Sequence, residues 1–285
     1  MFFPAGIGAI NFGSDYKRYH KLSLSVLREF GFGTNRLMET RILQEFQAMD
    51  DFIRTKNGVE FYPSEIVGLA TYNVMRNILL GKRGDYENGL DEILKNFILF
   101  FENATVAIDV APGLLKRIPY FGRKVELCVK GMTRICEILE QDIEKLKENG
   151  GAECFVSSYL ARVGPDYDRE QLIYTVRDLI SGGFETTTTT LLWLLVLLAN
   201  NPSTIKRLQK DIDDVIPRHR LPSLDDQPKL PFFEATILET MRLRTILPLS
   251  VPRLTLSDSE VCGYFIPANT KVSLLTQFHY IGDTT

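Results

Sequence analysis

Apolar positions recur with a helical period through the first three quarters of the chain. Between residues 16 and 30, Leu22, Val26 and Phe30 fall on one face and basic residues fall elsewhere. This spacing predicts an amphipathic helix. Similar patterns predict further helices at residues 39–56, 63–80, 90–102 and 123–148. A loop rich in apolar residues and punctuated by proline and glycine is expected at 111–122.

A long central helix is predicted between two clear limits. Asp168 followed by Gln171 resembles a capping box, and Pro202 follows the far end. A continuous helix of this size would be roughly 50 Å long at about 1.5 Å per residue. Residues 191–198 are apolar on every side. We therefore expect that half to be enclosed by protein, since its apolar run is shorter than the roughly 20 residues of a membrane span.

The pattern changes towards the end of the chain. Two more helices are expected from Pro202, with Leu208 on the inward face, and from near Pro231. After residue 248, short runs rich in β-branched residues at 251–256, 261–267 and 270–275 predict a small sheet. Residues 267–270, with the sequence Pro-Ala-Asn-Thr, are predicted to form its hairpin turn.

Composition narrows the class of protein. The 285 residues are 45% hydrophobic and 24% charged, as in an ordinary globular protein with one large or two small domains. The net charge of −3 gives no support for nucleic-acid binding. The four cysteines form no CxxC pair, and none of the three histidines belongs to an HExxH motif, so the sequence gives no support for a classical zinc hydrolase.

Gly182-Gly183-Phe184-Glu185-Thr186-Thr187 interrupts the central helix. Each glycine inside a helix costs about 1 kcal/mol relative to alanine, so folding alone does not favour this insertion. Paired glycines would let a flat ligand approach, and an acid beside an alcohol could relay protons to it. The alternative is a close helix–helix crossing in which the threonine hydroxyls bond to carbonyls four residues earlier. This segment alone leaves both interpretations open.

Glu239 and Arg242 lie three residues apart on a predicted helix. Such a pair is usually a surface ion pair that contributes about 0.2–0.5 kcal/mol. In a buried pair, loss of one partner would cost about 3–5 kcal/mol. Apolar neighbours such as Leu238 and Met241 favour partial burial.

The order of these motifs resembles the cytochrome P450 superfamily of heme-thiolate monooxygenases. A long helix with GGxETT is followed by a helix with ExxR, then by PLSVPR and GYFIPANT. The early stretch DYKRYHKLSLSVLREFGFG is similar to the microsomal animal type, and the motifs extend over residues 14–280. The resemblance implies a mainly α fold with a long central helix and a small β-sheet region near the C-terminus. It also implies a single domain over residues 1–285 that is incomplete at both ends.

The resemblance implies an enzyme that inserts one oxygen atom from O2 into an apolar organic substrate. Its cofactor would be heme, and a flavoprotein reductase would be its electron-donating partner. The intact protein would lie at the cytosolic face of the endoplasmic reticulum membrane. There the 111–122 loop would contact the membrane surface, although a packed loop is an equal alternative.

The same resemblance assigns roles to individual residues. Glu185 and Thr186 would be the catalytic pair that delivers protons. Residues assigned to the heme environment are Tyr16, His20, Gly182, Gly183 and Arg253. Residues assigned to the substrate pocket are Phe184, Ile246, Leu247 and Leu249, and Glu239 and Arg242 would form a structural ion pair.

Two departures from the family pattern bear on activity. Tyr16 and His20 stand where the family has Trp and Arg, which implies a weaker partner for a heme propionate at neutral pH. None of Cys128, Cys136, Cys154 and Cys262 stands in an FxxGxRxC context, so no axial iron ligand is assigned to this chain. We therefore expect the chain as given to be inactive. The alternative is a heme-free remnant that acts as a helical binding or interaction protein or has no function.

Overall fold

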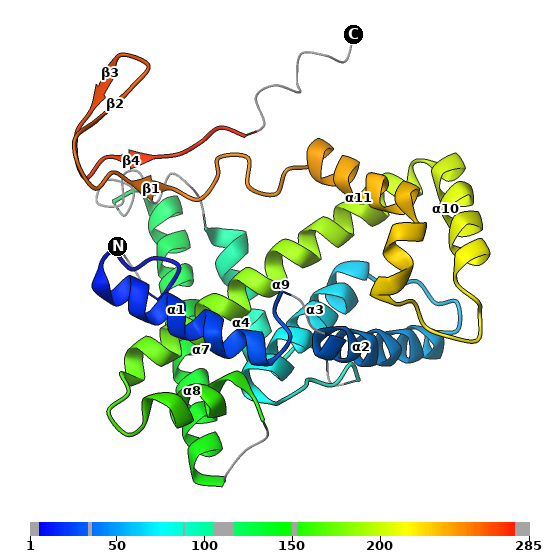
Figure 1. The fold of residues 1–285 in the computed structure, drawn as a ribbon, viewed down its shortest axis with the longest axis horizontal. Coiled ribbons are helices and arrows are strands. Elements are labelled where there is room, and N and C mark those ends of the chain that lie inside the picture. The colour runs from blue at the N-terminus through cyan, green and yellow to red at the C-terminus, as the bar shows by residue number, and fades with distance from the viewer. Residues whose placement is uncertain (1–5, 34–35, 88, 105–116, 150–152, 277–285) are drawn as a thin grey trace. The chain divides into compact units, whose positions relative to one another are not determined.

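The protein is mainly helical, as the sequence predicts (Figure 1). A computed structural model describes residues 6–33, 36–87, 89–104, 117–149 and 153–276. The chain divides into two compact units, Met1–Thr188 and Thr189–Thr285. The boundary between them falls within the central helix, α9 (Arg169–Ala199).

The predicted helices of the first unit are all present. They are α1 (Ser14–Glu29), α2 (Arg36–Thr55), α3 (Pro63–Leu80), α4 (Glu92–Asn103), α7 (Pro119–Asn149) and the first part of α9. The structure adds α8 (Phe155–Val163), which was not predicted from the sequence. α7 begins four residues earlier than expected, so residues 119–122 are helical and not part of a loop. Residues 111–116 of the predicted loop lie outside the described residues. Asp168 caps α9 as predicted, because its Oδ1 accepts the Gln171 N–H at 3.0 Å.

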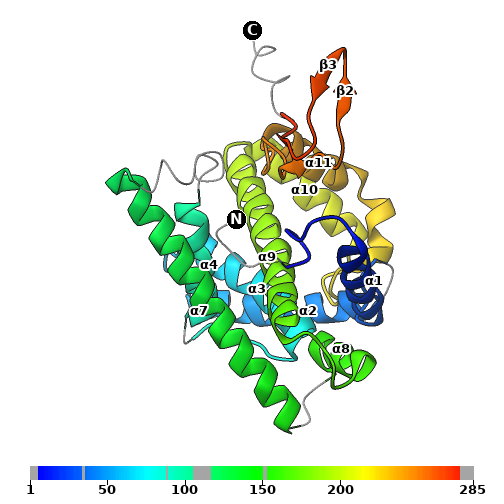
Figure 2. The same cartoon turned by 90° about the vertical axis from the view of Figure 1, so that its left-hand side faces the viewer.

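The core of the first unit is built where α9 meets α3 and α4. Phe184 of α9 is only 2% exposed. Its ring lies 6.0 Å from that of Tyr72 on α3, and 5.4 Å and 6.1 Å from those of Phe97 and Phe101 on α4. Separations of this size are typical of favourable aromatic pairs. α4 in turn packs along α7 (Figure 2), and a Cβ at Gly131 of α7 would come within 3.1 Å of the Asn96 carbonyl oxygen.

A buried carboxylate joins α2 to α3. Glu45 is 5% exposed. It accepts hydrogen bonds from Asn73 Nδ2 at 2.9 Å, Arg83 Nε at 2.7 Å and the Tyr86 hydroxyl at 2.5 Å. Burial and the nearby Glu45 carboxylate both raise the pKa of Tyr86. Because a buried charge needs such partners, these contacts make the packing of α2 on α3 specific.

The second unit combines short helices with two small antiparallel ribbons. Its elements after α9 are α10 (Pro202–Val215), the short 3-10 helix η1 (Leu224–Lys229), α11 (Pro231–Leu243), β1 (Arg253–Leu254), β2 (Ser259–Val261), β3 (Tyr264–Ile266) and β4 (Lys271–Val272). β1 pairs with β4, and β2 pairs with β3. Leu208 is buried on the inward face of α10, as predicted.

The predicted position of the hairpin turn is wrong. The tight turn lies between β2 and β3 at Cys262 and Gly263, which have φ angles of 52° and 84°. Positive φ at both central residues suits the right-handed twist of a hairpin, but Cys-Gly lacks the usual Asn or Asp signal. Residues 267–270 instead connect β3 to β4, where the Thr255 side chain bonds the Pro267 carbonyl and the Thr270 N–H.

The apolar second half of α9 is not enclosed by the described part of the chain. Leu195 is 47% exposed and Val196 is 49% exposed. Other side chains of this half, such as Leu194 and Leu197, face α11 and line a groove. The expectation of burial on all sides was wrong because α10 and α11 do not surround this half. By length and composition α9 could cross a membrane, but core helices of globular proteins also pass that test.

We predict that Phe184→Ala lowers the free energy of unfolding by about 3–5 kcal/mol, because it empties the centre of the aromatic cluster. Leu195→Ala is the matched control and should change it by about 0.5 kcal/mol or less, since that side chain is half exposed. Urea unfolding followed by circular dichroism measures both. Equal losses for the two variants would contradict this account of the core.

Candidate functional site

The two glycines of the 182–187 segment have different surroundings. A Cβ at Gly183 would lie 2.4 Å from the Met75 sulfur, so α3 packs directly on this position. A Cβ at Gly182 would meet no atom of the described residues within 4 Å. Close helix packing therefore accounts for Gly183 but gives no reason for Gly182. Gly182 is the position where a flat ligand could lie against the helix.

The threonines of the segment bond to their own helix. Thr186 Oγ1 donates to the Gly182 carbonyl oxygen at 2.9 Å, and Thr187 Oγ1 donates to that of Gly183 at 3.0 Å. Thr188 is buried, donates to the Phe184 carbonyl at 2.7 Å, and meets Thr71 Oγ1 of α3 at 2.6 Å. The helix-crossing alternative required a close helix–helix contact and threonine hydroxyls bonded to carbonyls four residues earlier. Both are present on the side of α9 that faces α3.

Glu185 and Thr186 are half-buried. Residues four apart in a helix share a face, so Thr186 lies one turn beyond Gly182 on the open side. Glu185 directly precedes Thr186 and lies next to the open side of the helix. An acid and an alcohol therefore flank the open position, which is the arrangement that proton relay requires. Phe184 points the other way, into the aromatic core, and its assignment to a substrate pocket stays a prediction.

Tyr16 and His20 lie one turn apart near the start of α1 in the same unit. Their rings stack with centroids 5.2 Å apart, and Tyr16 also meets Phe12 at 5.6 Å. Both side chains are half-buried. The hydroxyl and the imidazole are hydrogen-bond donors of the kind that a carboxylate ligand would need.

The remaining predicted residues belong to the second unit. Arg242 Nε donates to Glu239 Oε2 at 2.6 Å, so the predicted ion pair is formed. The Glu239 side chain is 51% exposed and the Arg242 side chain is 40% exposed. The partial burial expected from the apolar neighbours is therefore not found. The bond to Arg242 lowers the pKa of Glu239. An exposed pair of this kind contributes at most about 1 kcal/mol.

Arg253 is exposed on β1, and the segment after α11 holds Ile246, Leu247 and Leu249. Leu247 and Leu249 are 47% and 40% exposed. These residues belong to the second unit, whereas those around Gly182 belong to the first. Their roles in heme and substrate binding stay predictions.

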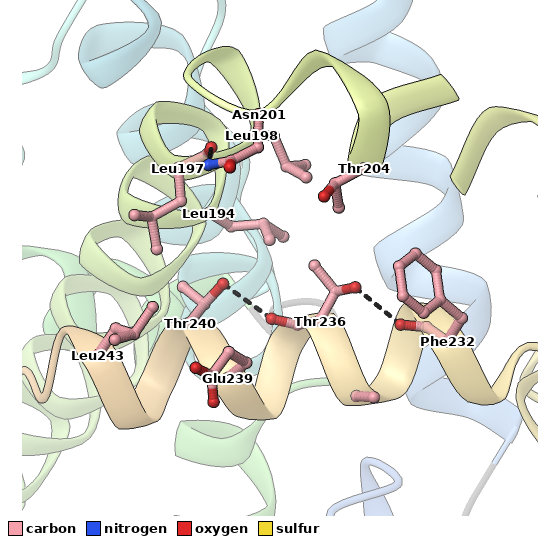
Figure 3. A pocket seen from close by; sticks show the side chains of 11 residues that line it. Leu194, Leu197, Leu198, Asn201, Thr204, Phe232, Thr236, Glu239, Thr240 and Leu243 are labelled. Atoms are coloured by element: carbon pink, nitrogen blue, oxygen red, sulfur yellow. Dashed lines mark hydrogen bonds between the residues drawn. The ribbon is translucent and has the colours of Figure 1, made fainter. Parts of the chain in front are cut away.

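A groove of about 370 Å³ lies between the second half of α9 and α11 (Figure 3). Apolar side chains such as Leu194, Leu198 and Phe232 form most of its wall. The hydroxyls of Thr236 and Thr240 bond to carbonyls of α11 at 2.7 Å and 2.9 Å. Of the predicted site residues, Glu239 alone is among the groove's lining. The groove therefore has no lining residue in common with the set assigned to the substrate pocket.

The four cysteines are placed unlike iron ligands. Cys128 donates to the Phe100 carbonyl at 3.7 Å, and Cys154 precedes α8 with its backbone N–H bonded to Ser157 Oγ. Cys136 lies 3.9 Å from Arg177 Nη1, and Cys262 is in the exposed hairpin turn. Burial raises the pKa of both Cys128 and Cys136, which disfavours their thiolate forms.

Sequence reasoning missed the polar partners of α9. The Gly8 N–H donates to Asp178 Oδ2 at 3.1 Å, and the Tyr19 hydroxyl donates to Asp168 Oδ2 at 3.3 Å. Asp168 was recognised only as a helix cap. No spacing rule links residues that are 170 and 149 positions apart, so these contacts carried no signal in a single sequence.

Comparisons with known proteins agree on one family. The family model described as Cytochrome P450 matches residues 6–279. The chain is 31% identical over 275 residues to Cytochrome P450 2B4 of Oryctolagus cuniculus, covering 91% of the chain and 55% of that protein. It is 30% identical over 287 residues to Cytochrome P450 2U1 of Rattus norvegicus, covering 94% and 53%. The chain thus spans about half the length of the curated relatives it matches.

We predict opposite effects for alanine at the two glycines. Gly182→Ala should raise the free energy of unfolding by up to about 1 kcal/mol, since alanine favours the helix and meets nothing. Gly183→Ala should lower it by about 1–2 kcal/mol through overpacking against Met75. Chemical unfolding of both variants measures the difference.

Adding Met75→Ala provides the control for that comparison. It removes the side chain that the new methyl group meets, so the cost of the double variant should be smaller than the sum of the single costs. Additive costs, or a loss at Gly182 as large as that at Gly183, would show that the two positions do not differ as described.

Proposed function

The chain belongs to the cytochrome P450 family, and we propose that it supplies the oxygen-activating side of a heme-thiolate monooxygenase site. The observation that carries this proposal is the open position at Gly182, with Glu185 and Thr186 beside it. Helix packing explains Gly183 and leaves Gly182 without a structural reason. A flat ligand at this position gives one.

Heme is the cofactor of this family, and the residues present fit one of its faces. Gly182 offers bare backbone to a planar ring, while Tyr16 and His20 offer donors to its carboxylates. Arg253 would add a cation for a propionate, since charge-assisted bonds of this kind are strong. When bound, heme supplies the redox-active iron at which dioxygen is activated.

The proposed task of Glu185 and Thr186 is to hold and move protons. Thr186 Oγ1 now donates to the Gly182 carbonyl oxygen. Threonine in a helix uses two χ1 rotamers, so the hydroxyl can leave this bond and turn its proton towards the open face. Oγ1 would give this proton to a ligand oxygen at the open face, and a proton from the Glu185 carboxyl, passed through a water molecule, would replace it. The Glu185 carboxylate would then take up a proton from solvent. The pair thus acts as a relay that is reset by the carboxyl.

The substrate and partners follow from the same proposal. The substrate would be a small apolar organic molecule, held by Ile246, Leu247 and Leu249 of the second unit. Electrons would come from a flavoprotein reductase, the usual partner class of this family. The protein would lie at the cytosolic face of the endoplasmic reticulum, in contact with the membrane surface. Glu239 and Arg242 would form a structural ion pair of the second unit.

The axial thiolate would come from a cysteine other than the four described. Each of those four has a partner or an exposed turn that does not suit iron ligation. This observation also favours a second candidate function, in which the chain is a heme-free helical binding protein. The two candidates differ in whether the natural gene product provides a further cysteine in an FxxGxRxC context.

We predict that the purified 285-residue chain binds no stoichiometric heme with a thiolate-type spectrum. The protein expressed from the complete natural transcript should instead give a thiolate-type Soret band with carbon monoxide after reduction. The absorption spectrum of each preparation measures this. Absence of the band from the natural product would overturn the monooxygenase proposal and support the heme-free alternative.

We predict that, in the heme-containing natural product, Thr186→Val lowers substrate oxidation by about 100-fold, the lower range of an acid–base contribution. Thr187→Val is the matched control, because Thr187 is the next residue and makes the equivalent bond to the Gly183 carbonyl. It should retain activity. The rate of product formation at saturating substrate measures both. Equal losses would show that the hydroxyl of Thr186 has no special role.

A further inference from the structure

We propose that Tyr19 and Asp178 are positioning residues that hold α1 and the segment before it in one place on α9. The inference rests on the proposed function for its purpose, because α1 carries Tyr16 and His20 while α9 carries Gly182 and its neighbours. Two hydrogen bonds make up the proposed attachment: the Gly8 N–H donates to Asp178, and the Tyr19 hydroxyl donates to Asp168.

The first attachment joins the segment before α1 to the middle of the first half of α9. The Gly8 N–H donates to Asp178 Oδ2 at 3.1 Å. A Cβ at Gly6 would lie 2.2 Å from the same oxygen and 2.5 Å from the Tyr174 carbonyl oxygen. Only glycine allows so close an approach, so the backbone of this segment lies directly on α9 (Figure 2).

Asp178 is held in the orientation that this contact needs. Arg177 is 5% exposed, and its Nε and Nη2 donate to Asp178 Oδ1 at 3.0 Å and 2.7 Å. Oδ1 is therefore engaged by the guanidinium, and Oδ2 faces Gly8. A hydrogen bond to a charged carboxylate is worth more than one to a neutral acceptor.

The second attachment joins α1 to the N-terminus of α9. The hydroxyl of Tyr19, which is 8% exposed, donates to Asp168 Oδ2 at 3.3 Å and accepts from Arg18 Nη2 at 2.7 Å. Asp168 Oδ1 meanwhile caps α9 through the Gln171 N–H. The carboxylate that begins α9 therefore also holds α1.

The two attachments are separated along α9, which is why they fix a direction as well as a place. Asp168 and Asp178 are ten residues apart, or about 15 Å along a helix axis. Tyr19 precedes His20 by one residue, so turning Tyr19 towards Asp168 sets the direction in which Tyr16 and His20 point. At the other end of α1, Arg162 of α8 bonds Ser25 and pairs with Glu29. The attachments thus act on the half of α1 that carries the assigned residues.

Residue-resolved amide hydrogen exchange on the 285-residue chain tests the proposal without heme. Asp178→Ala should speed exchange at the bonded amides of Gly8, Ala9 and Ile10 and at His20 by about tenfold or more, as expected for loss of a bond to a charged acceptor. Asp178→Asn is the matched control and should stay within about threefold of the original chain, since its amide oxygen still accepts. Tyr19→Phe should speed exchange in the first two turns of α1 by about threefold to tenfold.

Amides of α3 and α4 distinguish positioning from general stability and should keep their protection in every variant. Faster exchange throughout the unit, no local change, or a change at Gly8, Ala9 and Ile10 that spares His20 would each overturn the proposal. Because the measurement involves no heme, it is independent of the Soret spectrum. Failure of the attachment and failure of the monooxygenase proposal are therefore separate results.

Discussion

Close packing of α9 against α3 is the constraint on which the rest of the first unit depends. Gly183 lies against Met75, and one residue later Phe184 fills the space between α3 and α4. Protein interiors are packed as densely as organic crystals, so these contacts permit only one orientation of α9 about its own axis. That orientation turns Gly182 and Thr186 away from the core. The open face is thus a consequence of how the opposite face is filled.

The positions of the helices could be predicted because apolar periodicity is a local property of the chain. The limits of α9 followed from Asp168 and Pro202, and both hold in the structure. The hairpin turn could not be predicted in the same way, because Cys262 and Gly263 carry no standard turn signal. Burial failed as a prediction for the second half of α9 because it depends on which elements surround a helix, and sequence pattern does not contain that information.

The residues of the candidate site could be predicted from the sequence, but the different surroundings of these residues could not. Motif order led to Gly182, Glu185 and Thr186, whose roles remain proposals. Nothing in the sequence distinguishes Gly182 from Gly183, whereas in the structure Met75 packs against Gly183 and not against Gly182. Likewise, the ExxR spacing predicts the ion pair of Glu239 and Arg242, but only the structure shows how much of it meets solvent. Contacts such as Gly8 to Asp178 join distant segments and could be found only in three dimensions.

The placement of the four thiols gives the chain a ready means of selective chemical labelling. Cys262 is exposed at the tip of the β2–β3 hairpin, whereas Cys128 and Cys154 are buried and Cys136 is half-buried with a raised pKa. A maleimide dye applied briefly near neutral pH would therefore react first at Cys262, because reaction requires an accessible thiolate. The second unit could carry a fluorescent reporter without any engineered cysteine.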